Sequence, residues 1–246
     1  FQGSYPRLYD DRRQPPPANV LFENYVTTYL ERDVRQLTAV QDLATFHRFL
    51  QLCAARTGQL VNKANLSVEA GISQPSVERW LSVLESSNVV FRLQPFYANI
   101  SKRLIKTPKL YFCDTGLACY LAGIRSAQML ETHPLRGALF ENFVCAELLK
   151  ASFNVGTRPD IHFFRDKTGH EVDFLVRKET GDIEAIETKS GKTFSSAWLK
   201  DLRYALGLLG NEIGEASLLY SGSEESYMHN IAVRNVVNYL LGQSHH

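Results

Sequence analysis

The sequence predicts a mixed α/β protein in which a helical unit precedes a domain of alternating helices and strands. Apolar side chains recur at helical spacing through much of residues 20–122. Val172, Phe174 and Val176 alternate with other residues, as a strand requires, and residues 183–189 resume extended character after a turn. A broadly apolar helix at residues 135–152 precedes these strands. Together these patterns predict an N-terminal helical winged helix-turn-helix unit followed by an αβββαβ domain.

Composition sets the class of protein. The chain has 246 residues, of which 44% are hydrophobic and 22% charged, as in ordinary globular proteins with a sizeable core. With a net charge of +1, the protein as a whole has no long-range electrostatic attraction to nucleic acid or to membranes. The four cysteines form no Cys-x-x-Cys pair, so we expect no zinc site. No apolar run approaches the roughly 20 residues that cross a bilayer. We therefore expect a cytoplasmic protein without a membrane partner.

The chain divides into three segments by composition. Phe1-Gln2-Gly3-Ser4 resembles a tag remnant, and a proline-rich stretch follows it. We expect residues 1–19 to be tag remnant and linker, residues 20–124 a helical arm plus winged helix-turn-helix, and residues 125–246 the second domain. The chain would then be a fragment of a longer protein.

A helix-turn-helix is indicated in the first half. Gly71 ends one helix, Ser73 is a good N-cap for the next, and Pro75 falls in its first turn, where a missing N–H costs little. Helix, glycine turn and capped helix are typical of this motif. The expected helices are residues 20–37, 42–57, 63–70, 74–86 and 117–122, with a loop at 124–134.

The segment after this motif resembles a basic wing. Strands are expected at residues 89–93 and 110–112, and residues 86–113 contain no acidic side chain. Basic side chains there suit phosphate contacts, so DNA is a candidate partner. The helix at 74–86 carries a net charge of −1 and would read bases poorly, so protein docking and a purely structural role are the alternatives. The candidate nucleic-acid-binding residues are Arg92, Lys102, Arg103, Lys106 and Lys109.

The second half has a clearer order of elements. After the helix at residues 135–152, three strands, a helix, a strand and a last helix follow. The expected ranges are 161–165, 171–177 and 183–189 for the three strands, then 195–209, 216–220 and 230–241.

Four polar residues of this half are the candidate catalytic group. Glu187 and Lys189 are two apart and leave the same face of one strand, with Asp173 on the preceding strand. Glu141 shares an apolar helical stripe, an unusual place for a surface carboxylate. Mg²⁺ (or Mn²⁺) prefers oxygen ligands and polarises a phosphoryl oxygen, and a lysine can orient water. Asp173 and Glu187 would bind the metal directly and Glu141 through water. A solvated strand edge with a surface ion pair is the alternative.

These residues resemble the PD-(D/E)XK nuclease superfamily. Asp173 matches its Asp, Glu187-Thr188-Lys189 matches its (D/E)XK element, and Val172 replaces the usual proline. That superfamily has an αβββαβ core whose first helix carries an extra acidic residue, for which Glu141 is the candidate.

The chain as a whole resembles a domain of unknown function that follows an AAA-type ATPase core in prokaryotic ATP-binding proteins. Residues 25–34, 111–117 and 137–144 carry this resemblance, together with the two acidic motifs above. It implies a prokaryotic cytosolic protein with the ATPase upstream. Ser190-Gly191-Lys192-Thr193 looks like the end of a P-loop, but Ile186 stands where that motif needs glycine, so no ATPase motif is expected here. A non-catalytic nucleic-acid- or protein-binding module, or an oligomerisation or regulatory unit for the ATPase, is the alternative to a metal-dependent nuclease.

Overall fold

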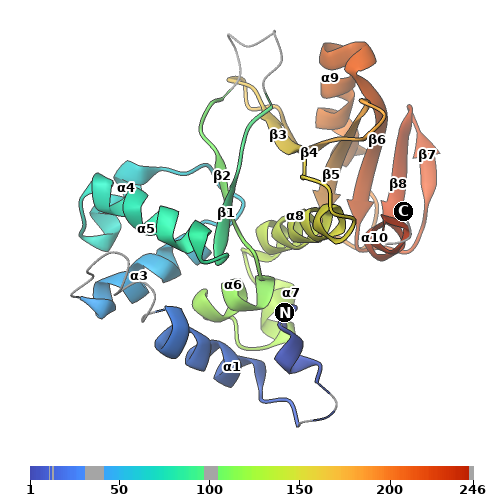
Figure 1. The fold of residues 1–246 in the computed structure, drawn as a ribbon. Helices are drawn as coiled ribbons and strands as arrows, with labels where there is room; N and C mark the ends of the chain where they lie inside the picture. The colour runs from blue at the N-terminus through green and yellow to red at the C-terminus, as the bar shows by residue number, and fades with distance from the viewer. Residues whose placement is uncertain (11, 13, 31–41, 97–104, 244–246) are drawn as a thin grey trace. The chain divides into compact units, whose positions relative to one another are not determined.

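The computed structural model describes residues 1–10, 12, 14–30, 42–96 and 105–243 (Figure 1). Helices accompany a two-stranded and a six-stranded sheet, which confirms the predicted mixed α/β class. The chain forms two compact units, and each combines two segments of sequence. The first unit contains residues 1–92 and 109–142, and the second contains residues 93–108 and 143–246.

The first unit begins with short helical segments. A 3₁₀ turn at Pro6–Leu8 precedes α1 (Ala18–Asn24), which continues as the π-helical turn η2 (Tyr25–Leu30). The rest of the helix predicted at 20–37 lies outside the described residues. α3 spans Leu43–Ala54, and its first turn is capped by Asp42, which accepts hydrogen bonds from the Ala44 and Thr45 amides.

The predicted helix-turn-helix elements are present with the predicted limits. α4 spans Lys63–Ala70 and α5 spans Gln74–Ser86. Gly71 ends α4 in the left-handed region at φ +72°, where a side chain would be strained. Ser73 caps α5 by accepting a hydrogen bond from the Ser76 amide. The core forms where the Trp80 ring meets two rings of α3 edge-on; these are Phe46 and Phe49, each 5.3 Å from it between centroids.

Two strands and two short helices complete the first unit. β1 (Val90–Leu93) pairs with β2 (Lys109–Phe112). α6 (Thr115–Leu121) starts at its N-cap, Asp114. The stretch expected as a loop contains α7 (Ala127–Thr132). No α7 residue is buried, and a helix that buries no face needs no apolar stripe. The sequence pattern that would have predicted this helix is therefore missing.

The second unit is built on the six-stranded sheet, in the order β3-β4-β5-β6-β8-β7. β3, β4 and β5 are antiparallel, β5, β6 and β8 are parallel, and β7 is antiparallel to β8. The strands are β3 (Ile161–Arg165), β4 (Glu171–Arg177), β5 (Ile183–Lys189), β6 (Ile213–Tyr220), β7 (Ser226–Met228) and β8 (Ile231–Asn235).

Helices flank this sheet. α8 (Arg136–Asn154) begins in the first unit and ends in the second. α9 (Lys200–Leu209) follows a 3₁₀ turn and packs on β4, β5 and β6 (Figure 1). The predicted order of helix, three strands, helix and strand is therefore observed. The last helix was predicted to start at residue 230, and this start is wrong. α10 spans Val236–Gln243, because residues 231–235 form a strand that pairs with β6.

The segment between β1 and β2 contributes to the second unit rather than to the first. The Phe96 amide donates to the Phe163 carbonyl at 2.7 Å, and the Ile105 amide donates to the Arg165 carbonyl at 3.0 Å. The Phe96 ring is buried in the core of the second unit. Gln94, Phe96 and Ile105 therefore cover the β3 edge, which would otherwise expose unpaired backbone groups.

Among the described residues, no helix is both long and apolar enough to cross a bilayer.

Candidate functional site

Asp173 is the most firmly held of the predicted site residues. It lies on β4 with 7% of its surface exposed. Its Oδ2 accepts two hydrogen bonds from Thr188 on β5, from the amide at 2.8 Å and from Oγ1 at 2.7 Å. Phe174 pairs with Ile186, so the same register continued by one residue brings Asp173 opposite Glu187. The predicted closeness of Asp173 to the Glu187-Thr188-Lys189 element follows from this register.

Glu187 and Lys189 interact directly, as their spacing on β5 predicts. Lys189 Nζ forms an ion pair with Glu187 Oε1. Glu187 is only 5% exposed, since β5 lies between β4 and β6. A buried carboxylate is costly unless it is paired, so the lysine compensates it in this structure. The pair is partly buried, unlike the solvated strand edge considered above.

Glu171 is a residue of this region that the sequence analysis missed. It is two residues before Asp173, so both side chains leave the same face of β4. Carboxylate oxygens of the two residues lie within 4.8 Å of each other. Arg165 Nη1 donates to Glu171 Oε2 at 2.8 Å. The signal was available, because the same spacing rule identified Glu187 and Lys189.

Glu141 lies on the part of α8 that belongs to the first unit. Its Oε1 accepts a hydrogen bond from Lys109 Nζ at 2.7 Å and another from the Tyr111 hydroxyl. Lys109 has only 1% of its surface exposed and the Glu141 side chain 15%, so the lysine of this ion pair is buried and the carboxylate partly buried. The other three candidates lie in the second unit, and the convergence of Glu141 with them stays a prediction.

The second unit offers donors that suit a hard divalent cation. Asp173, Glu171 and Glu187 present carboxylate oxygens, the ligand type that Mg²⁺ and Mn²⁺ prefer, and the first two already lie close together. Burial of Asp173 and Glu187 favours a bound cation, because it limits competition from bulk water. The residues therefore fit the predicted metal.

The predicted phosphate contacts have varied surroundings. Arg92 donates to Glu85 at 2.8 Å and to Glu78 at 2.6 Å. The hydrogen bonds that Arg92 donates to these carboxylates, first of all to Glu85, raise the pKa of Arg92. Lys109 is buried against Glu141, as described above. The charges of Arg92 and Lys109 are thus matched within the protein, which weakens the argument for phosphate binding by either.

The other three candidates for phosphate contact lie in the segment between β1 and β2. Lys106 belongs to the second unit, and Lys102 and Arg103 lie outside the described residues. Phosphate contact by this segment stays a prediction.

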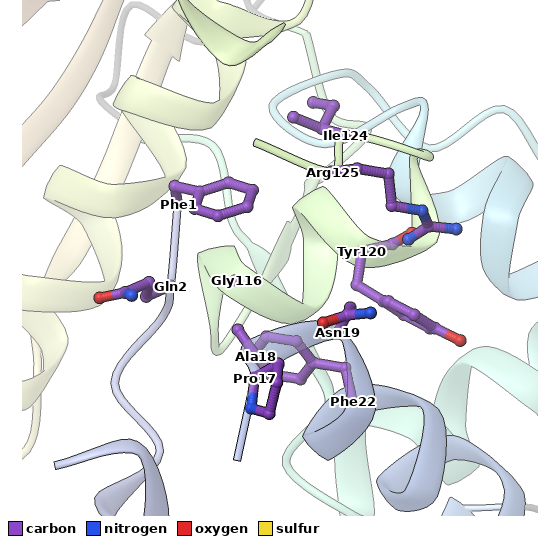
Figure 2. Close-up of a pocket in the computed structure, with 10 residues that line it drawn as sticks. All are labelled: Phe1, Gln2, Pro17, Ala18, Asn19, Phe22, Gly116, Tyr120, Ile124 and Arg125. Carbon is purple, nitrogen blue, oxygen red and sulfur yellow. The ribbon is translucent and has the colours of Figure 1, made fainter. Parts of the chain in front are cut away.

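A cavity of about 260 Å³ lies in the first unit (Figure 2). Phe1 lies on one side of it, and Tyr120 and Arg125 lie on the other. The Arg125 guanidinium stands 4.7 Å from the centre of the Tyr120 ring and donates to the Tyr120 carbonyl at 2.8 Å. None of the predicted catalytic residues lines this cavity, so its chemistry differs from that of the acidic site.

A second polar cluster lies at the turn between β3 and β4. Asp166 accepts hydrogen bonds from the Thr168 amide and hydroxyl, from the His170 amide and from the Tyr204 hydroxyl. Burial alone would raise the pKa of Asp166, but these bonds outweigh it and lower the pKa. His170 stacks on Tyr204 at 3.8 Å and bonds Asp201 at 2.8 Å. This cluster fastens α9 to the turn.

Two family models match consecutive parts of the chain. The chain belongs to the family described as domain of unknown function DUF8612, whose model matches residues 1–128. Residues 136–239 match the domain of unknown function DUF4143, which typically lies C-terminal to AAA-type ATPase domains. The predicted resemblance to such a domain is thereby confirmed.

Two mycobacterial proteins are among the similar relatives. Uncharacterized proteins of Mycobacterium tuberculosis and Mycobacterium bovis are each 33% identical to this chain over 200 residues. The match covers 81% of this chain and 43% of each relative. The chain therefore spans less than half the length of these curated relatives.

Proposed function

We propose that the second unit is a metal-dependent nuclease-like domain that acts on phosphodiester bonds of nucleic acid. The observation that carries the proposal is the buried Asp173 carboxylate. It is fixed to β5 by Thr188, within one residue of both Glu187 and Lys189. The order of helix, three strands, helix and strand around these residues supports the same reading.

Each residue of the proposed site has a separate role. Asp173 and Glu187 would hold Mg²⁺ or Mn²⁺, with Glu171 as a further carboxylate beside Asp173. A bound metal polarises the scissile phosphate and lowers the pKa of water. Lys189 would release Glu187 to the metal, orient the attacking water and offset negative charge on the phosphate.

The test is cleavage of plasmid DNA and of labelled DNA and RNA oligonucleotides by the purified chain with Mg²⁺ or Mn²⁺. Lys189→Ala and Asp173→Asn should each lower the rate by about 100-fold or more, as losses of transition-state stabilisation do. Lys150→Ala is the matched control, since Lys150 also pairs with a carboxylate, Glu147, but lies on α8 rather than on the strands that carry the site, with 40% of its side chain exposed. It should leave the rate unchanged.

Two results would reject the catalytic assignment. Cleavage that persists in both Lys189→Ala and Asp173→Asn would come from another site or from a contaminant. Absence of cleavage of every substrate with both metals would leave the domain without the proposed activity.

The second candidate is a non-catalytic nucleic-acid- or protein-binding module that regulates an ATPase core. One observation favours this candidate: three of the acidic side chains described above each pair with a basic side chain of the same protein. Lys189 pairs with Glu187, Arg165 with Glu171 and Lys109 with Glu141. Such pairs can stabilise buried acids without a metal.

The binding candidate has its own test. Labelled duplex and single-stranded DNA are titrated with the chain at low salt, where phosphate contacts are strongest. Absence of binding would eliminate DNA as the ligand and leave RNA or a protein as the partner. The candidate protein partner is an AAA-type ATPase domain upstream in the full-length protein, in keeping with the usual position of the matched C-terminal domain. Its ATP hydrolysis rate, with and without residues 1–246, would measure the coupling.

A further inference from the structure

We propose that Thr188, the middle residue of the Glu187-Thr188-Lys189 element, positions Asp173 for metal binding. The inference rests on the proposed metal site and adds a residue outside the metal ligands. Thr188 would act only through Asp173, by setting which carboxylate oxygen faces the metal.

The hydrogen bonds around Asp173 are asymmetric. Both bonds that Asp173 accepts from the described residues end on Oδ2, at 2.8 Å from the Thr188 amide and 2.7 Å from Thr188 Oγ1. A carboxylate oxygen that accepts two short bonds has little capacity left for a cation. Oδ1 is therefore the oxygen that can coordinate a metal, and the orientation of the carboxylate is set by Thr188.

Threonine suits this task for two reasons. Its branched side chain has few χ1 rotamers in a strand, so the hydroxyl is held beside the backbone amide of the same residue. Thr188 is only 6% exposed, so water does not readily replace the hydroxyl as donor. The amide and the hydroxyl of Thr188 both donate to Oδ2 of Asp173, so the carboxylate cannot rotate without losing both hydrogen bonds.

Loss of the hydroxyl has a specific consequence. In Thr188→Val the amide bond remains but the second bond is lost, so Asp173 can rotate and present either oxygen. Residues that orient metal ligands typically contribute about 10–100-fold to metal affinity. The affinity for metal should fall by that factor, while Asp173 itself is intact.

The experiment measures Mn²⁺ binding to the whole chain by isothermal titration calorimetry and by electron paramagnetic resonance, in the absence of nucleic acid. Thr188→Val should raise the Kd for Mn²⁺ by about tenfold or more, and Thr188→Ser should restore it to within about threefold of the wild type. The matched control is Thr168→Val, which removes another threonine hydroxyl bonded to an aspartate, Asp166, in the same unit. It should leave the Kd unchanged.

The outcomes separate this inference from the proposed function. If the wild type binds Mn²⁺ and Thr188→Val binds it equally well, Thr188 has no positioning role, although the metal site stands. If Thr188→Ser is as weak as Thr188→Val, the hydroxyl is not the cause and the inference is overturned. If the wild type does not bind Mn²⁺ at millimolar concentration, the metal site itself is rejected and the inference with it. Circular dichroism checks folding, and Thr188→Ala, which also removes the hydroxyl, is measured if Thr188→Val does not fold.

Discussion

Buried polar side chains in this protein are bonded in ways that sequence spacing shows only in part. The Glu187–Lys189 pair could be predicted, because two residues on one strand fix their common face. The bond from Thr188 to Asp173 could not, since it depends on the register between β4 and β5. Glu141 was recognised as an unusual carboxylate, but its partner Lys109 is 32 residues away in sequence. Spacing rules find neighbours on one element and miss partners on another.

Asp166 allows a prediction about pH at the same scale. The hydrogen bonds to its carboxylate lower its pKa in the folded state, so the ionised form stabilises the fold. That contribution is complete above the unfolded pKa, near pH 4, and is lost as pH falls through the lower folded value. Asp166→Asn should therefore reduce the free energy of unfolding by about 2 kcal/mol at neutral pH, and by progressively less below about pH 4.

Urea unfolding at several pH values measures this difference. Asp182→Asn is the control, since Asp182 is exposed in the turn between β4 and β5, and it should change stability by less than about 0.5 kcal/mol. A difference between wild type and Asp166→Asn that stays constant down to about pH 3 would contradict a lowered pKa.

Elements with strong local signals were predicted from sequence with accurate limits. α4, α5, β3, β4 and β5 begin and end where the periodicity and caps indicate. α7 was missed because it buries no side chain. β7 and β8 were missed because they are only 3 and 5 residues long. They are strands because β8 pairs with β6 and β7 pairs with β8. Short elements defined by distant partners carry little local pattern.

Phe96 gives a prediction for the segment that pairs with β3. Its ring has 6% of its surface exposed and packs in the core of the second unit. Phe96→Ala should therefore lower the unfolding free energy of that unit by about 3–5 kcal/mol, because it removes a buried aromatic side chain and leaves a cavity. The matched control is Phe153→Ala on α8, where the wild-type ring is 64% exposed and the effect should be small.

Hydrogen exchange localises this effect. Amides of β3 and β4 should lose protection in Phe96→Ala, while those of α5 should keep it, since α5 belongs to the first unit. Loss of protection in α5 alone would show that Phe96 belongs energetically to the other unit.

The whole chain is organised differently from a simple succession of two domains. It passes between the compact units after residues 92, 108 and 142. The sequence predicted one boundary between the two domains, after residue 124, because composition and loop signals are read along the chain and do not show which segments pack together. The αβββαβ order could be predicted, whereas the pairing of Gln94, Phe96 and Ile105 with β3 could not.

This organisation predicts a complementation experiment. A fragment of residues 125–246 keeps β4 but lacks Gln94, Phe96 and Ile105, which bond the other edge of β3. A peptide of residues 92–107 should bind it and raise its melting temperature, since a ligand at about 100 times its Kd stabilises by about 2.7 kcal/mol. The same peptide with Phe96→Ala should have a much weaker effect. Equal effects of the two peptides, or none from either at about 1 mM, would contradict the role of this segment.

The covered β3 edge also bears on how such proteins can recombine. A single genetic exchange between relatives at any codon from 109 to 160 would join the Phe96 segment of one parent to the β3 of the other. The hybrid would inherit mismatched ring packing at the sheet margin even if every helix and strand were complete. We therefore expect the Phe96 segment and β3 to be inherited together, although a long stretch of sequence separates them.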